Sequence, residues 1–133
     1  MEYTVAQHAT NVVNALVAAV QNLNNHLVRL KSVAKNSDVD HLIHEHGMAV
    51  DRLDWLVSYF RQVEMDPTME ITLNVYELSW INKAINETIV EHEKSLAWFS
   101  QMGSDNSALV HDFQDKIKEL NFTSFFINRS KII

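Results

Sequence analysis

The chain has no cysteine, one proline and two glycines among its 133 residues. The absence of cysteine excludes disulfides, thiolate catalysis and zinc sites built on cysteine, and it favours a reducing, cytoplasmic setting. So few turn residues, together with 47% hydrophobic residues, favour long helices over a sheet. The sequence therefore predicts an all-α fold in a single domain that spans residues 1–133.

Basic residues are scarce as well. Lys and Arg number 11 against 17 Asp and Glu, which gives a formal net charge of −6. Such a chain is a poor partner for nucleic acid, because phosphate binding needs clustered Lys and Arg. The longest strictly apolar run, residues 15–20, is too short for a membrane span. We therefore expect no nucleic-acid partner and no membrane partner.

Charge is missing altogether from residues 3–28, although this stretch has the apolar spacing of a long helix. Its polar positions are Asn, Gln, Thr and His. Removing an amide from water costs less free energy than removing an ion. A charge-free polar face therefore predicts contact with protein on more than one side. This pattern favours assembly, as a homodimer or with another protein.

Apolar residues at alternating spacings of three and four predict four helices, at about residues 4–35, 38–65, 67–102 and 104–121. Thr4 with Gln7 has capping-box spacing, as has Ser37 with Asp40, and Pro67 suits the first position of the third helix. Short connections favour antiparallel neighbours. We therefore predict an antiparallel up-down four-helix bundle with three long helices, a shorter fourth helix and an apolar C-terminal tail.

A fourth helix that ends at residue 121 leaves part of the third helix without a partner. Folding the chain about its breaks stops the fourth helix opposite about Ala84, so residues 68–84 need another cover. The tail, residues 122–133, could supply it as an extended segment or a helical turn, and a second chain is the alternative. The residues predicted at an interface are Val12, Asn14, Val17, Trp55, Tyr59, Leu73, Tyr76 and Trp80. In a monomer closed by its own tail, the same aromatic residues would belong to the core or its boundary.

Six of the seven histidines fall in the opposite half of the predicted bundle. The same folding places His26 level with His46 and with Glu87. Imidazole and carboxylate groups from facing helices can hold a transition metal such as Zn, Fe, Cu or Ni. The candidate ligands are His26, His46, Glu87, Glu91, His41, His44, His92 and His111. Alternatively, these residues set the helix register, lie solvated at helix ends, or form a pH-responsive cluster.

Residues 41–46, His-Leu-Ile-His-Glu-His, precede an amphipathic helix and resemble the opening of a hemerythrin-like helix. The resemblance covers one helix and implies a di-iron helical bundle in which His92 and His111 imitate later ligands. The family has Glu four residues after a histidine of a middle helix, whereas Leu96 stands at that distance from His92. The di-iron site of that family is therefore not assigned to this chain.

The sequence contains no recognisable catalytic group of residues, and no cofactor is expected. We expect a non-enzymatic protein-interaction module, such as an acidic adaptor, regulator or inhibitor, that self-associates through the first and third helices. A metal-binding bundle of His and carboxylate ligands is the first alternative. The second is a bundle that binds a small apolar ligand near Trp55, Tyr76 and Trp80.

Overall fold

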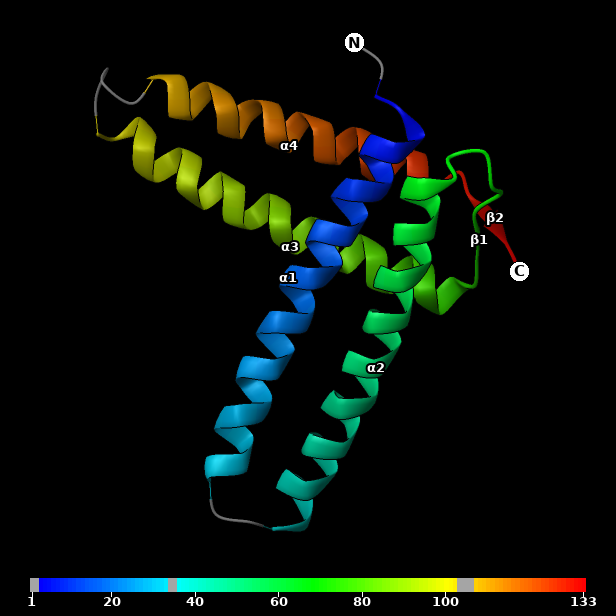
Figure 1. Ribbon diagram of the computed structural model, residues 1–133. Helices are drawn as coiled ribbons and strands as arrows, with labels where there is room; N and C mark the ends of the chain where they lie inside the picture. Colours follow the sequence, from blue (N-terminus) through cyan, green and yellow to red (C-terminus); the bar gives the residue numbers. More distant parts are fainter. Residues whose placement is uncertain (1–2, 34–35, 103–106) are drawn as a thin grey trace.

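Four helices and two short strands make up the described part of the chain (Figure 1). The computed structural model describes residues 3–33, 36–102 and 107–133. The elements are α1 (Val5–Ser32), α2 (Ser37–Met65), β1 (Thr72–Leu73), α3 (Val75–Ser100), α4 (Ser107–Ile127) and β2 (Lys131–Ile132). The predicted all-α class is confirmed. None of the helices in these ranges is both long enough and apolar enough to cross a membrane.

Side-chain caps start the first two helices. Thr4 forms the predicted capping box, in which its Oγ1 accepts the Gln7 N–H at 3.1 Å and the Gln7 side chain accepts the Thr4 N–H at 2.7 Å. The cap of α2 lies one residue earlier than predicted, because the Asn36 side chain accepts the Val39 N–H at 2.9 Å. The predicted end of the first helix at residue 35 and the predicted start of the fourth at 104 lie outside the described residues.

The third helix begins at Val75 instead of at residue 67. Asn74 and Glu77 form a reciprocal capping box, with N···O distances of 2.8 and 2.9 Å, which fixes the start of the helix at the next residue. Upstream of this cap, residues 71–73 alternate between buried and half-buried, as expected of an extended segment. The capping box and this alternation correct the predicted start.

The fourth helix continues to Ile127, past its predicted end at residue 121. Leu120, Thr123 and Ile127 keep the spacing of three and four and are all buried, so the apolar pattern is interrupted only by the hydroxyl of Thr123. The added turns bring α4 beside Asn82, whose side chain accepts the Ser124 hydroxyl at 3.4 Å. Part of the segment expected to lack a fourth-helix partner is therefore covered.

Beyond α4 the chain also forms the extended segment that the sequence allowed. β2 pairs in parallel with β1, with Thr72 opposite Lys131. The Lys131 N–H donates to the Ile71 carbonyl at 3.2 Å, and the Ile133 N–H donates to the Leu73 carbonyl at 3.0 Å. The tail therefore ends as a strand that packs against the segment before α3.

The helices form two antiparallel hairpins, α1 with α2 and α3 with α4, whose long axes diverge (Figure 1). In the predicted up-down bundle, all four helices would lie side by side along their length. Instead, the hairpins meet near one end of each and their tips extend in different directions. Short loops determine which helices are neighbours within a hairpin, but they do not fix the angle at which two hairpins pack.

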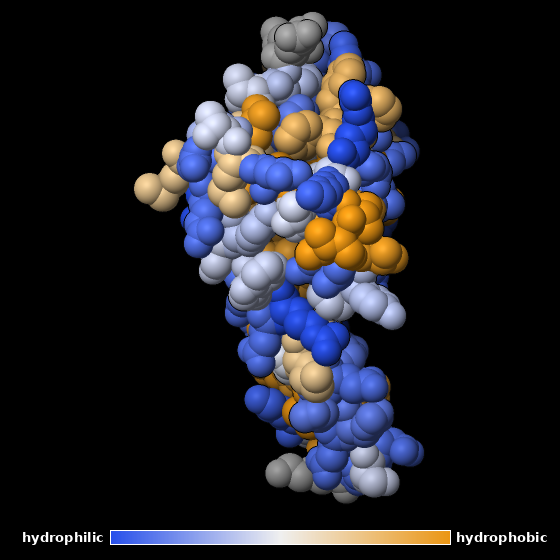
Figure 2. All heavy atoms as spheres, turned by 90° about the vertical axis from the view of Figure 1, so that its right-hand side faces the viewer, coloured by the Kyte–Doolittle hydropathy of each residue, from blue (hydrophilic) through white to orange (hydrophobic). Residues whose placement is uncertain are grey.

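The distribution of buried residues accounts for this crossing. The buried hydrophobic residues are Ala9, Val12, Val13, Ala15, Leu16, Leu53, Leu56, Phe60, Val63, Ile71, Leu73, Ile81, Ala84, Ile85, Leu120 and Ile127. No residue is buried in residues 17–33 and 36–52, which we call the first arm, or in the described residues of 86–119, which we call the second arm. Burial of apolar surface is the main attraction between helices, so the hairpins share a core only where they cross. In Figure 2 the lower part of the molecule, where the first arm lies, is mostly hydrophilic.

Candidate functional site

Three aromatic side chains gather where α2 faces the start of α3. Trp55 of α2 is 56% exposed and Tyr76 of α3 is 72% exposed, whereas Trp80 is half-buried. They line an open groove of about 540 Å³ together with Arg52, Asn74 and Glu77. The Arg52 guanidinium carbon lies 5.5 Å from the Trp80 ring centroid, within the range of a cation–π contact. We call this groove and its six residues the aromatic surface.

Tyr59 packs against the aromatic surface through Trp55. Its ring stacks on Trp55 with 5.6 Å between the ring centroids. Its hydroxyl accepts the Thr72 N–H at 3.0 Å and lies 3.5 Å from the Glu70 carbonyl, to which it donates. Tyr59 therefore ties α2 to the chain around β1 and restricts the orientation of Trp55.

Two residues predicted at an interface are part of the core instead. Val12 and Leu73 are completely buried within the chain, since both face the crossing of the hairpins. On α1, Asn14 is exposed and Val17 is half-buried. The exposed members of the predicted interface are therefore found mainly on α2 and α3.

His26 and His46, predicted to lie level with each other, stack in the first arm with 4.9 Å between their ring centroids. The His46 Nδ1 lies 2.8 Å from the Leu42 carbonyl. A carbonyl only accepts, so Nδ1 carries the proton and Nε2 has the free lone pair when the ring is neutral. On the same helix, His41 pairs with Glu45 at 3.0 Å, and His44 is exposed.

The remaining predicted ligands lie on α3 and α4. His92 packs against Phe113 at 5.6 Å between centroids, and burial, followed by the positive charge of Lys116, lowers the pKa of His92. His111 is exposed. These histidines belong to the second arm, so the expectation that six histidines share one end of a bundle is corrected by the divergence of the hairpins.

Two glutamates complete the set of predicted ligands. Glu91 pairs with Lys94 at 3.4 Å, and Glu87 lines an open groove of about 730 Å³ together with His26. Among residues 3–33, 36–102 and 107–133, no group of three or more His, Cys, Asp or Glu side chains is close enough to hold a metal ion. The stacked pair His26 and His46 is therefore the nearest approach to the predicted site.

His8, which is not among the predicted ligands, is the one buried histidine of the described chain. Its Nδ1 lies 2.8 Å from the Thr123 hydroxyl oxygen, which also accepts the Asn11 side-chain N–H at 3.0 Å. The imidazole stacks on Phe126 with 4.6 Å between centroids and an interplanar angle of 15°, and Tyr3 approaches it edge-on at 5.9 Å. This contact joins the first turns of α1 to the last turns of α4.

Burial lowers the pKa of His8, because the charged imidazolium is poorly solvated inside the protein, and the negative charge of Glu119 opposes this effect in part. His8 is therefore favoured in its neutral form. A neutral imidazole has one N–H donor and one acceptor nitrogen, so its bonding to Thr123 decides which nitrogen can donate elsewhere.

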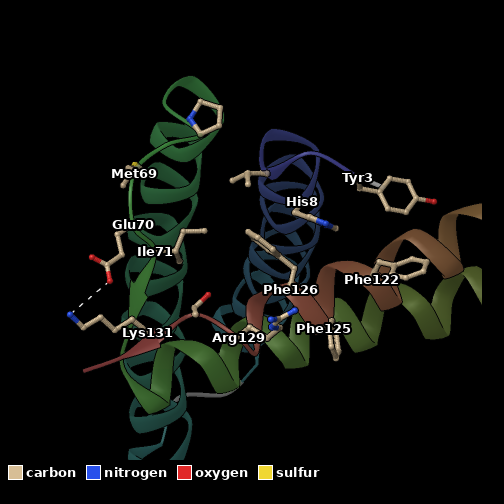
Figure 3. Close-up of a pocket in the computed structure, with 13 residues that line it drawn as sticks. Tyr3, His8, Met69, Glu70, Ile71, Phe122, Phe125, Phe126, Arg129 and Lys131 are labelled. Atoms are coloured by element: carbon tan, nitrogen blue, oxygen red, sulfur yellow. Dashed lines mark ion pairs between the residues drawn. The ribbon is translucent and has the colours of Figure 1, made fainter. Parts of the chain in front are cut away.

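His8 lines an open groove of about 900 Å³, which we call the Phe groove after three of its lining residues on α4, Phe122, Phe125 and Phe126 (Figure 3). Pro67, Met69, Ile71 and Val5 add further apolar lining. Two cations line it as well. Arg129 lies over the Phe125 ring at 5.5 Å, and Lys131 pairs loosely with Glu70 at 3.8 Å.

The sequence did carry a signal for His8 and Thr123. His8 stands four residues before Val12 on the apolar face of α1, and Thr123 stands three residues after Leu120 and four before Ile127. Polar residues at such positions are buried when the helix packs, and they then need a hydrogen-bond partner. A pairing across 115 positions cannot be read from the spacing within either helix.

Comparison with protein-family models, curated proteins and solved structures finds no match to this chain.

Proposed function

We propose that this protein is a non-enzymatic protein-interaction module that forms a homodimer through the aromatic surface. The observation that carries the proposal is the exposure of Trp55 and Tyr76 beside Trp80 in one continuous groove. Trp, Tyr and Arg are the residues that most often dominate binding energy at protein interfaces. Exposed large aromatic residues cost free energy in water, and a partner removes that cost.

Charge favours a second copy of the chain as the partner. The aromatic surface carries Arg52 on α2 and Glu77 on α3. In a two-fold symmetric contact the same patch of both chains meets. Arg52 of each chain can therefore face Glu77 of the other chain, which gives two pairs of opposite charge. Opposite charges at the rim of an interface fix its register, while the central aromatic rings supply most of the affinity.

The proposal includes α1 as a second contact region, beside α3. The charge-free face of α1 remains exposed at Asn14, Ala18 and Asn22. Ala18 and Asn22 line an open groove of about 950 Å³ with Lys83 and other residues of α3. Uncharged side chains are desolvated at lower cost than ions, so this face suits contact with protein.

The test is the mass of the protein in solution, measured by light scattering across micromolar concentrations. We expect the mass of two chains for the native protein and of one chain for Trp55→Ser. Trp98→Ser is a matched control, because Trp98 is also 56% exposed but lies in the second arm; this variant should stay dimeric. A mass of one chain for the native protein at every concentration would remove the homodimer.

A second candidate function is binding of a transition metal by His26 and His46. It is favoured by the hydrogen bond from His46 Nδ1 to the Leu42 carbonyl, since histidine ligands of metals commonly donate their other ring N–H in this way. We expect stoichiometric metal in protein prepared without chelators, and its loss in His46→Ala. The exposed residue His44 supplies the control variant His44→Ala. Metal analysis that shows none would exclude this candidate.

A further inference from the structure

The Phe groove combines apolar walls with a buried imidazole and cationic groups. Figure 3 shows Phe122, Phe125 and Phe126 on α4, with Met69 and Ile71 across from them and His8 above. Its volume of about 900 Å³ lies in the range of small-molecule sites, which are mostly apolar with a few placed polar groups. This groove is separate from the aromatic surface, with which it shares no lining residue.

Contacts with α4 fix the position of the His8 ring at the groove. The Thr123 hydroxyl oxygen accepts the Asn11 N–H and lies 2.8 Å from His8 Nδ1, and either the hydroxyl or the imidazole can supply the proton of that second bond. His8 is only 7% exposed and Thr123 is completely buried, so this arrangement is held by packing.

Cationic groups border the same groove. Arg129 follows the end of α4 and lines the groove with its guanidinium above Phe125. In the described ranges no ion pair involves Arg129, whereas Lys131 is paired with Glu70. A guanidinium that has no ion pair among the described residues, and that lies beside aromatic rings, selects an anion attached to an apolar body.

We propose that the Phe groove binds an amphipathic carboxylate, a molecule with an acyl chain and one carboxylate group. The chain lies along the phenylalanine side chains, and the carboxylate accepts hydrogen bonds from Arg129. The planar fork of a guanidinium matches the two oxygens of a carboxylate. The apolar walls exclude a small hydrophilic anion as the preferred ligand, because such an ion would leave them in water.

Decanoate is the probe, used below its micelle-forming concentration, and decyltrimethylammonium is the control with the same chain and the opposite charge. Calorimetry should show decanoate binding to one site per chain. Octanoate should bind about 15-fold more weakly, because two methylene groups are lost. The cationic control should bind at least tenfold more weakly than decanoate.

The site is located with amide NMR shifts and two variants. Decanoate should shift the amides of Thr123, Phe126 and Arg129 and leave that of Trp55 in place. Arg129→Gln should weaken binding by about tenfold, because a charge-assisted hydrogen bond is lost. Lys118→Gln is the matched control, since Lys118 is exposed on α4 outside the groove and its substitution removes the same charge. It should change the affinity less than twofold.

Each opposite result overturns the proposal. These results are the absence of decanoate binding, equal binding of the anionic and cationic probes, shifts confined to the aromatic surface, or equal losses in Arg129→Gln and Lys118→Gln. Both substituted side chains are exposed, so circular dichroism should show unchanged helix content in both variants. The mass of the native protein in solution is a separate readout, so failure here leaves the homodimer untouched.

Discussion

His8 and Thr123 stand 115 positions apart in the chain and are joined by a buried hydrogen bond of 2.8 Å. The bond fastens the start of the first hairpin to the end of the second. It is the central polar contact of the crossing, since His8 and Thr123 are the buried polar residues of the described chain.

Replacing Thr123 by Val should destabilise the protein. Val has nearly the same shape but leaves His8 Nδ1 and the Asn11 N–H without their shared partner. The expected loss in the free energy of unfolding is about 1–3 kcal/mol, measured by urea unfolding. Thr10→Val is the control, because Thr10 is exposed and bonds only Glu64 at its side chain. Similar losses in both variants would contradict a special role for the buried bond.

Acidification should also destabilise the protein. Burial lowers the pKa of His8, and that of His92, below their values in the unfolded chain. Between the two pKa values the unfolded chain binds more protons, so the free energy of unfolding falls as the pH drops below about 6.5. His8→Gln should reduce the slope of stability against pH, whereas His44→Gln, which removes an exposed histidine, should keep the native slope. An unchanged slope in His8→Gln would exclude His8 as its source.

The N-terminal cap of α3 should contribute measurably to the free energy of unfolding. Asn74→Ala removes the acceptor of the Glu77 N–H, and the expected loss is about 1 kcal/mol in the free energy of unfolding. Asn86→Ala changes the same residue type at an exposed interior position of α3 and should be neutral or slightly stabilising. Urea unfolding of both variants decides the matter. Equal stability of the two would show that the capping box contributes nothing.

The proposed homodimer should be sensitive to charge at the aromatic surface. Arg52→Glu removes the cation over Trp80 and places a negative charge opposite the partner's Glu77. The dissociation constant of the dimer should therefore rise at least about tenfold. Arg61→Glu makes the same charge change at another exposed position of α2, outside the aromatic surface. Sedimentation should detect dissociation in the first variant alone. Equal effects would indicate general charge repulsion instead of a local contact.

The sequence was sufficient for the cap of α1 and for neighbours within a hairpin. Thr4 and Gln7 form the predicted capping box, and His26 meets His46 as predicted from folding the chain about the first break. A capping box depends on a spacing of three residues, and the level of two antiparallel helices depends on the length of one loop. Both are local properties of the chain.

Features that depend on contacts between the two hairpins cannot be predicted from the spacing of residues within one helix or loop. His92 and His111 lie in the second arm because the packing angle is set by where large side chains such as Phe60 and Leu16 are buried. Thr123 interrupted the apolar pattern, and its partner His8 was visible only in three dimensions. The continuation of α4 to Ile127 depends on the same contact. Thr123 can lie on the buried face of α4 because its hydroxyl bonds His8 and Asn11 of α1.

The absence of buried residues in both arms has a consequence for the motions of the protein. An element held by one neighbour and open to water on its other sides opens locally at a small free-energy cost, while a shared core opens only with global unfolding. Amide hydrogens of residues 20–30 and 90–100 should therefore exchange with solvent through fraying of each hairpin tip. Those of residues 9–16 and 56–63 should be protected to the full stability of the fold.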